Sequence, residues 1–159
     1  MKKIRLISHS KGALGLRLFG LGPNLFACNG LKKLKNLLDF NTDWAKDRSI
    51  NDLKKCLAKS DVIISLWIGR EIVGFGRALS DDVYRGILWD VVIDKNYQGF
   101  GYGKVIVNKL IQSNHLQKVE KIYLMTSNKK TFYSQLGFEE VSSQTLLLKK
   151  KLTPKKDIF

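Results

Sequence analysis

The stretch Gln98-Gly99-Phe100-Gly101-Tyr102-Gly103-Lys104 places three glycines at alternate positions, between an apolar segment and an amphipathic one. Glycine lacks a Cβ, so the backbone can turn sharply there and its N–H groups can approach an anion closely. A helix is predicted to begin at the end of this stretch, and its unpaired N–H groups and the positive end of its dipole would meet at the same place. The stretch therefore predicts a loop that binds a pyrophosphate.

Two common nucleotide-binding motifs do not fit this loop. The dinucleotide fingerprint is G-x-G-x-x-G, whereas the glycines here run G-x-G-x-G and are followed by Lys104. A P-loop needs a glycine where Gln98 stands and a hydroxyl residue where Val105 stands. An ordinary glycine-rich turn between a strand and a helix remains the alternative.

Length and composition predict one main folded domain. A chain of 159 residues can bury a core without disulfides or metal, and its two cysteines and two histidines offer no ligand set for a structural zinc. No apolar run approaches the length needed to cross a bilayer, so we expect no membrane partner and a reducing compartment.

The net charge of +14 is concentrated at the two ends of the chain. Residues 1–38 carry eight Lys/Arg and no acid, and residues 149–159 carry five Lys and one acid. A nucleic-acid groove would instead run through the folded body, so we expect no specific nucleic-acid partner.

We divide the chain into a basic N-terminal extension (1–28) with one strand near residues 14–19, a central domain (29–149) and a basic C-terminal tail (150–159).

Hydrophobic periodicity predicts the elements of the central domain. Helices are expected at 30–40, 49–59, 102–114 and 129–136, and strands at 61–68, 71–79, 85–94, 119–126, 138–141 and 144–149. The order ααβββαβαββ indicates an α+β or α/β fold with a mixed central sheet and flanking helices.

Four segments in the same order resemble the GCN5-related N-acetyltransferases. They are Val73-Gly74-Phe75-Gly76-Arg77-Ala78-Leu79-Ser80-Asp81, Leu88-Trp89-Asp90-Val91-Val92-Ile93, Tyr97-Gln98-Gly99-Phe100-Gly101-Tyr102-Gly103-Lys104 and Phe132-Tyr133-Ser134-Gln135-Leu136-Gly137-Phe138. The similarity covers residues 31–149. It is closest to a plastid and cyanobacterial branch related to plant serotonin N-acetyltransferases.

The resemblance implies that acetyl-coenzyme A is the co-substrate and that no metal is needed. Its pantetheine arm would lie where two strands splay apart, and backbone N–H groups would bind its pyrophosphate. The residues that the resemblance assigns to the cofactor are Val91, Val92, Ile93, Gln98, Gly99, Phe100, Gly101, Tyr102, Gly103 and Lys104. It implies that Tyr133 lies near the sulfur, with packing of the last helix as the alternative. Relatives of the branch often have Asn or Asp where Thr126 stands, and Lys129 replaces a small residue.

Three other residues are candidates for the acceptor side. Asp90 alternates with apolar residues in its strand and could act as the general base, or it could bind the backbone at the strand end. Trp44 could line a pocket for an aromatic amine, or it could pin two helices together. Arg77 could contact the substrate or stabilise a hairpin.

The sequence thus predicts direct acetyl transfer to a primary amine, either a small arylalkylamine or a protein lysine or N-terminus. A non-catalytic coenzyme A-binding regulatory module and a basic RNA-associated protein are the alternatives. We expect the plastid stroma or a bacterial cytoplasm, and a homodimer is left open.

Overall fold

The computed structural model describes residues 3–149 and divides the chain into two compact units, Met1–Ser127 and Asn128–Phe159. The predicted basic tail, residues 150–159, lies outside the described residues. The first unit contains β1 (Ile4–Ser8), η1 (Lys11–Ala13), α1 (Leu14–Phe19), η2 (Pro23–Leu25), α2 (Gly30–Asn41), α3 (Ile50–Ala58), β2 (Val62–Ile68), β3 (Glu71–Ser80), β4 (Arg85–Ile93), η3 (Lys95–Tyr97), α4 (Tyr102–Ile111) and β5 (Lys121–Tyr123). The second unit contains α5 (Lys130–Ser134).

The five strands form one mixed sheet in the order β1-β2-β3-β4-β5. Pairing is antiparallel from β1 to β4 and parallel between β4 and β5. A parallel pair needs a crossover connection, and α4 provides it. The predicted mixed sheet with flanking helices is therefore confirmed.

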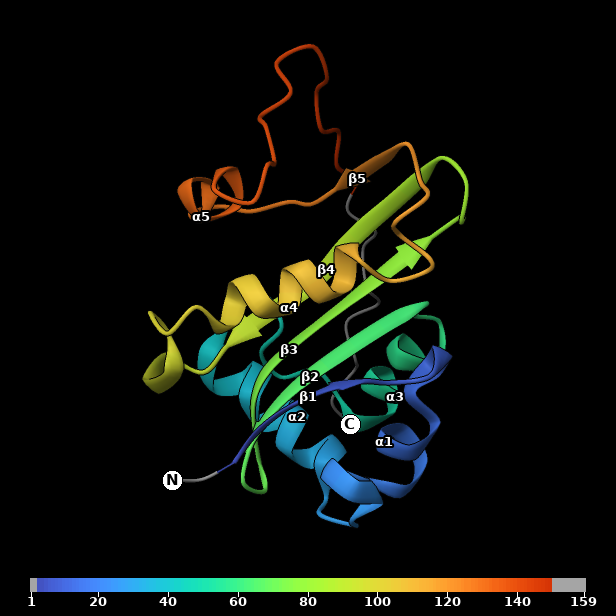
Figure 1. The fold of residues 1–159 in the computed structure, drawn as a ribbon, viewed down its shortest axis with the longest axis vertical. Coiled ribbons are helices and arrows are strands. Elements are labelled where there is room, and N and C mark those ends of the chain that lie inside the picture. The colour runs from blue at the N-terminus through green and yellow to red at the C-terminus, as the bar shows by residue number, and fades with distance from the viewer. Residues whose placement is uncertain (1–2, 150–159) are drawn as a thin grey trace, which may run out of the picture. The chain divides into compact units, whose positions relative to one another are not determined.

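Helices cover both faces of this sheet (Figure 1). On one face, the leucines of α2 that recur at helical spacing are buried, as predicted, and form the main core with Trp67, Phe75 and Val92. On the other face lies α4, whose Ile106, Val107 and Leu110 are fully buried. The described part of the chain contains no helix long and apolar enough to cross a membrane.

Two glycines of β3 allow α4 to lie close to the sheet. A Cβ on Gly74 would lie 2.8 Å from Ile106 Cδ1, and a Cβ on Gly76 would lie 2.8 Å from Ile106 Cγ2. Both distances are shorter than van der Waals contact, so a larger residue at either position would force Ile106 to shift. The sequence of β3 thereby fixes where α4 and the loop before it can lie.

The strand predicted near residues 14–19 is wrong, because this segment forms helix α1. Leu14, Leu16 and Leu18 alternate as in a strand, yet Leu16 alone of the three is buried. The edge position beside β2 is already taken by β1, so a strand at 14–19 would lack that partner. Packing of Leu16 in the core, rather than intrinsic propensity, stabilises this short helix.

The end of the predicted element order is also wrong. The structure has no strand at 138–141 or 144–149, and β5 is only three residues long. Leu146, Leu147 and Leu148 are 73%, 87% and 77% exposed. Strand propensity alone does not hold a strand, because a ladder needs a neighbouring strand to pair with. The preceding order ααβββαβα is confirmed from α2 to α5.

We predict that Gly76→Ala lowers the free energy of unfolding by about 1–3 kcal/mol, because the added methyl group overpacks the contact with α4. Urea unfolding followed by tryptophan fluorescence measures this change. Gly15→Ala is the matched control, because its Cβ would lie 3.4 Å from Leu21 Cδ1, an ordinary contact, within helix α1. Equal destabilisation by the two substitutions would contradict the close-packing explanation.

Candidate functional site

The loop before α4 has the backbone conformation that its glycines were predicted to allow. Gly99 and Gly101 have φ of +84° and +79°, in the left-handed region that favours glycine. A Cβ built on either residue meets nothing within 4 Å, so this side of the loop is open. The loop has room for a ligand against its backbone.

The first turn of α4 has no acid and no side-chain cap. The first intrahelical bond that closes the turn is donated by Val105 to the Gly101 carbonyl at 3.2 Å, so the N–H groups of the three preceding residues have no acceptor within the helix. Lys104, in this turn, is exposed and adds positive charge where the dipole is already positive. This arrangement suits a phosphate or another anion.

Two side-chain hydrogen bonds fix the position of the loop and of η3 before it. The Gln98 side-chain amide donates to the Ile93 carbonyl at 3.1 Å, and Asn41 at the end of α2 accepts from the Lys95 N–H at 2.8 Å. Asn41 was not predicted from the sequence, because nothing in the pattern of α2 sets its last residue apart. The first bond attaches the loop to β4, and the second attaches η3, just before the loop, to α2.

The parallel strands β4 and β5 separate after a short pairing. Their ladder runs from Arg85↔Lys121 to Ile87↔Tyr123, whereas β4 continues to Ile93. The part of β4 that contains Val91, Val92 and Ile93 therefore has no ladder partner on this side within the described residues. Such an open strand edge can pair with an extended ligand.

A β-bulge lies in this open part of β4. Arg77 pairs with Trp89 and Phe75 pairs with Val92, so Asp90 and Val91 together oppose Gly76. Asp90 has φ +53°, which aspartate tolerates better than most residues. The bulge places Trp89 and Asp90 on the same side of the sheet, and both contact Arg77.

Asp90 is the centre of a buried ion cluster. Its Oδ2 accepts from Arg77 Nε at 2.6 Å and from Arg48 Nη1 at 3.0 Å, and its side chain is 4% exposed. Arg77 also donates to Ser60 Oγ at 3.3 Å. The alternative in which Asp90 binds the backbone at the strand end is wrong, because its carboxylate accepts from two guanidinium groups instead. Its catalytic role stays a prediction.

Two other predicted site residues, Trp44 and Arg77, lie at this ion cluster. Trp44 is 57% exposed, so the alternative in which it pins α2 to α3 is wrong. The Arg48 guanidinium lies 5.6 Å from the centre of the Trp44 ring, and the Arg77 guanidinium lies 6.0 Å from that of Trp89. Arg77 stabilises the β3–β4 pair through Asp90, while its contact with substrate stays a prediction.

The structure thus brings together Trp44, Arg77 and Asp90, and adds Arg48, which sequence analysis missed. Arg48 lies in the connection between α2 and α3, forty-two positions from Asp90. Its only signal in the sequence is that it precedes the N-cap Ser49 of α3. Neither charge pattern nor spacing relates it to β4.

Tyr133 lies in α5 of the second unit. Its ring makes edge contacts with Phe132 and Phe138, at centroid distances of 4.9 and 5.9 Å. Burial raises the pKa of the Tyr133 hydroxyl above its usual value. The phenol is therefore protonated at neutral pH and can donate a proton.

The chain is similar to known proteins of one family. Residues 59–140, just over half of the chain, match the acetyltransferase (GNAT) domain. The chain is 37% identical over 113 residues to "Uncharacterized N-acetyltransferase ycf52" of Pyropia yezoensis, an alignment that covers 68% of this chain and 64% of that protein. It is 37% identical over 71 residues to "GCN5-related N-acetyltransferase 2, chloroplastic" of Arabidopsis thaliana, covering 44% of this chain and 28% of that protein.

A solved structure shares the fold. The putative GNAT-family acetyltransferase of Xanthomonas campestris has a TM-score of 0.69 at 20% identity, covering 96% of this chain and 95% of that one. The fold is an α+β acetyltransferase fold, and the chain belongs to the GNAT family. Its relatives are consistent with the predicted plastid and cyanobacterial branch. The chain spans less than two thirds of the length of these two relatives.

We predict that Asp90→Ala destabilises the protein by about 3–5 kcal/mol, because it leaves Arg77 buried without its charged partner. Thermal and urea unfolding measure the loss. Glu120→Ala is the control, since it removes an exposed ion pair with Arg85 and is expected to cost less than about 1 kcal/mol. A similar cost for the two substitutions would show that the Asp90 cluster contributes no more than a surface pair.

Proposed function

We propose that this protein is an acetyl-coenzyme A-dependent N-acetyltransferase that transfers acetyl directly to a primary amine. The observation that carries the proposal is the loop of Gly99 and Gly101. Both glycines have positive φ, both have open space above them, and they precede an uncapped helix that begins where β4 ends. GNAT enzymes use acetyl-coenzyme A, and these residues fit the diphosphate of that molecule.

The backbone from Gln98 to Lys104 would hold the diphosphate through its N–H groups, with the α4 dipole and Lys104 adding positive charge. The open edge of β4 at Val91, Val92 and Ile93 would pair with the pantetheine amides as an added strand does. When bound, the thioester supplies the acetyl group. A backbone N–H at Val92 or Ile93 would stabilise negative charge on the thioester oxygen.

The acceptor must lose a proton before it can attack. An alkylammonium has a pKa of about 10, so a base or a chain of water molecules has to remove that proton at neutral pH. Asp90 is the proposed base. Tyr133, whose raised pKa keeps its hydroxyl protonated, would donate a proton to the departing thiolate. No covalent enzyme intermediate is required.

The acceptor would approach the connection between α2 and α3. Trp44 is exposed there and Arg48 lies over its ring, so an aromatic amine could stack beside the tryptophan. A protein lysine or N-terminus is the other proposed acceptor, and Arg77 would act through Asp90 and Trp89. We propose a plastid stroma or a bacterial cytoplasm as the compartment, supported by the chloroplastic relative, and leave a homodimer open.

One observation favours a second function, a coenzyme A-binding module without catalysis. Oδ2 of Asp90 already accepts from two arginines and the side chain is only 4% exposed, so little of the carboxylate is open to an incoming amine. Such a module would bind acetyl-coenzyme A without turning it over. The experiments below separate the two functions, since binding and turnover are measured apart.

We predict that Gly101→Val raises the dissociation constant for acetyl-coenzyme A at least tenfold. A branched side chain is strained at φ +79° and would stand where the diphosphate is proposed to lie. Isothermal titration calorimetry measures the constant. Asp82→Val is the control, because Asp82 also has positive φ (+63°) and is exposed, but lies in the β3–β4 turn outside the loop. Unchanged binding by Gly101→Val would contradict the proposed cofactor site.

We predict turnover on at least one primary amine, measured as coenzyme A release over a panel of arylalkylamines and lysine peptides. Tyr133→Phe should lower kcat by roughly 10²-fold without changing acetyl-coenzyme A affinity, because it removes only the proton donor. Tyr84→Phe, at an exposed turn position, should have no effect. Tight binding of acetyl-coenzyme A without release on any amine would favour the binding module.

A further inference from the structure

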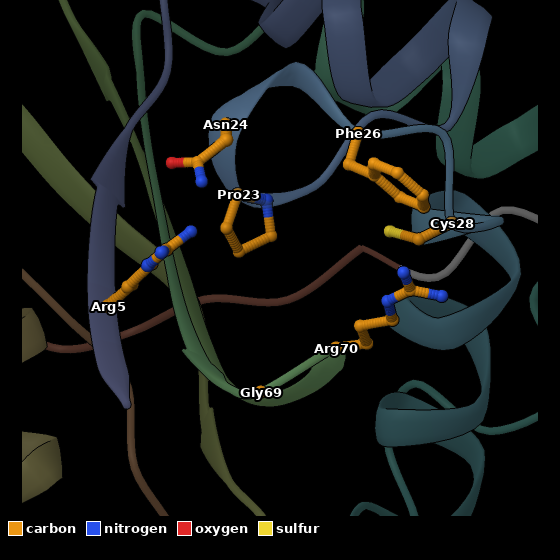
Figure 2. Close-up of a pocket in the computed structure, with 7 residues that line it drawn as sticks. All are labelled: Arg5, Pro23, Asn24, Phe26, Cys28, Gly69 and Arg70. Carbon is orange, nitrogen blue, oxygen red and sulfur yellow. The ribbon is translucent and has the colours of Figure 1, made fainter. Parts of the chain in front are cut away.

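A pocket of about 190 Å³ lies in the first unit, away from the residues of the proposed active site. Figure 2 shows its walls: Arg5 of β1, the segment around η2 with Pro23, Asn24, Phe26 and Cys28, and the β2–β3 turn at Gly69 and Arg70. These three segments are distant in the sequence. None of them contributes to the glycine loop, the β4 bulge or the Asp90 cluster.

The walls are held by backbone bonds and by a buried tryptophan. The η2 segment is closed by a bridge between Leu21 and Ala27 and by a bond from the Gly22 N–H to the Phe26 carbonyl at 2.9 Å. A Cβ on Gly22 would lie 3.2 Å from the fully buried Trp67 ring, so this segment sits directly on the core. The backbone of the η2 segment, which carries four of the lining residues, is therefore anchored to the core.

Two guanidinium groups line this pocket without an acidic partner. Within residues 3–149, neither Arg5 nor Arg70 makes an ion pair or donates a side-chain hydrogen bond. The acid adjacent to Arg70, Glu71, is bound by Lys33 at 2.7 Å, and Lys33 also donates to the Arg70 carbonyl. Residues 1–38 contain no acid at all. Both guanidinium groups can therefore donate hydrogen bonds to an anion that enters the pocket.

The orientation of Arg70 is suited to binding an anion. Its guanidinium lies 4.3 Å from the centre of the Phe26 ring, and such stacking limits rotation while leaving the in-plane N–H groups available. The Asn24 side chain also lines the pocket, as Figure 2 shows. A carboxamide can donate two hydrogen bonds to an oxyanion. The pocket thus combines two forked cations with one neutral donor.

We propose that this pocket binds a phosphate group, either free in a small phosphorylated molecule or as the headgroup of an anionic lipid. A tetrahedral oxyanion accepts bonds from several directions, which fits donors placed on opposite walls. The volume is below the roughly 300 Å³ at which drug-sized ligand sites begin, so it fits a single small group rather than a whole nucleotide. Leu25 lies in the same segment and is 80% exposed. It would contact the lipid if the phosphate belongs to a headgroup, and water if the phosphorylated molecule is soluble.

The test is a ¹H–¹⁵N NMR titration of the full chain with inorganic phosphate. We expect saturable shifts of the Gly69 and Cys28 amides, and an affinity reduced about tenfold or more in both Arg5→Gln and Arg70→Gln, as expected for loss of a charge-assisted bond. Lys32→Gln is the matched control, because it removes one exposed charge from the same basic region and should change the affinity less than twofold. Equal weakening by all three variants, or no saturable shift, would overturn the proposal.

A second measurement uses the unsubstituted protein and does not depend on the variants folding. Cys28 lines the pocket and Cys56 does not, so phosphate should slow alkylation of Cys28 by iodoacetamide and leave Cys56 unchanged. Equal rates for Cys28 with and without phosphate would contradict the site.

The same alkylation assay distinguishes the two sources of the phosphate group. The rate for Cys28 is compared in the presence of glucose 6-phosphate and of phosphatidylcholine vesicles with and without phosphatidic acid. Protection by the sugar phosphate identifies a soluble ligand, and protection by the acidic vesicles alone identifies a lipid.

Discussion

The close approach of α4 to β3 is the constraint on which the candidate site depends. Gly74 and Gly76 leave no side chain between the strand and Ile106, so the helix lies against the backbone of the sheet. The start of α4 is thereby brought to the end of β4, where the ladder to β5 has already stopped. A bulkier residue in β3 would move the helix, and with it the N–H groups that the loop presents.

The β4 bulge is the second constraint, and it depends on charge as well as packing. A strand that follows its normal alternation would turn Asp90 toward α4, among apolar residues. The left-handed conformation at Asp90 instead turns it toward Arg77 and Arg48. A buried carboxylate is stable there because two cations compensate its charge. The same cluster ties the connection between α2 and α3, where Trp44 lies, to the strand that would hold the thioester.

The N-terminal segment contributes more than charge to the fold. It provides the edge strand β1, and Ala13 and Leu16 enter the main core. The segment around η2 rests on Trp67 and shapes a second concave surface lined by Arg5 and Arg70. The two proposed anion sites would act for different physical reasons. One presents backbone N–H groups and a helix dipole, and the other presents two side-chain cations that no described acid neutralises.

The sequence by itself determined the order of elements from α2 to α5, the loop at the start of α4 and the family. Those features depend on local properties, namely leucines at helical spacing, β-branched runs and glycines at alternate positions. The tertiary structure decided which way Asp90 faces, that Arg48 reaches it, and that residues 14–19 form a helix. These outcomes depend on contacts between residues far apart in the chain, on a bulge that shifts the register, and on which strand already occupies an edge. Residues 138–149 show the same limit, because a strand-like composition becomes a strand only where a partner is available.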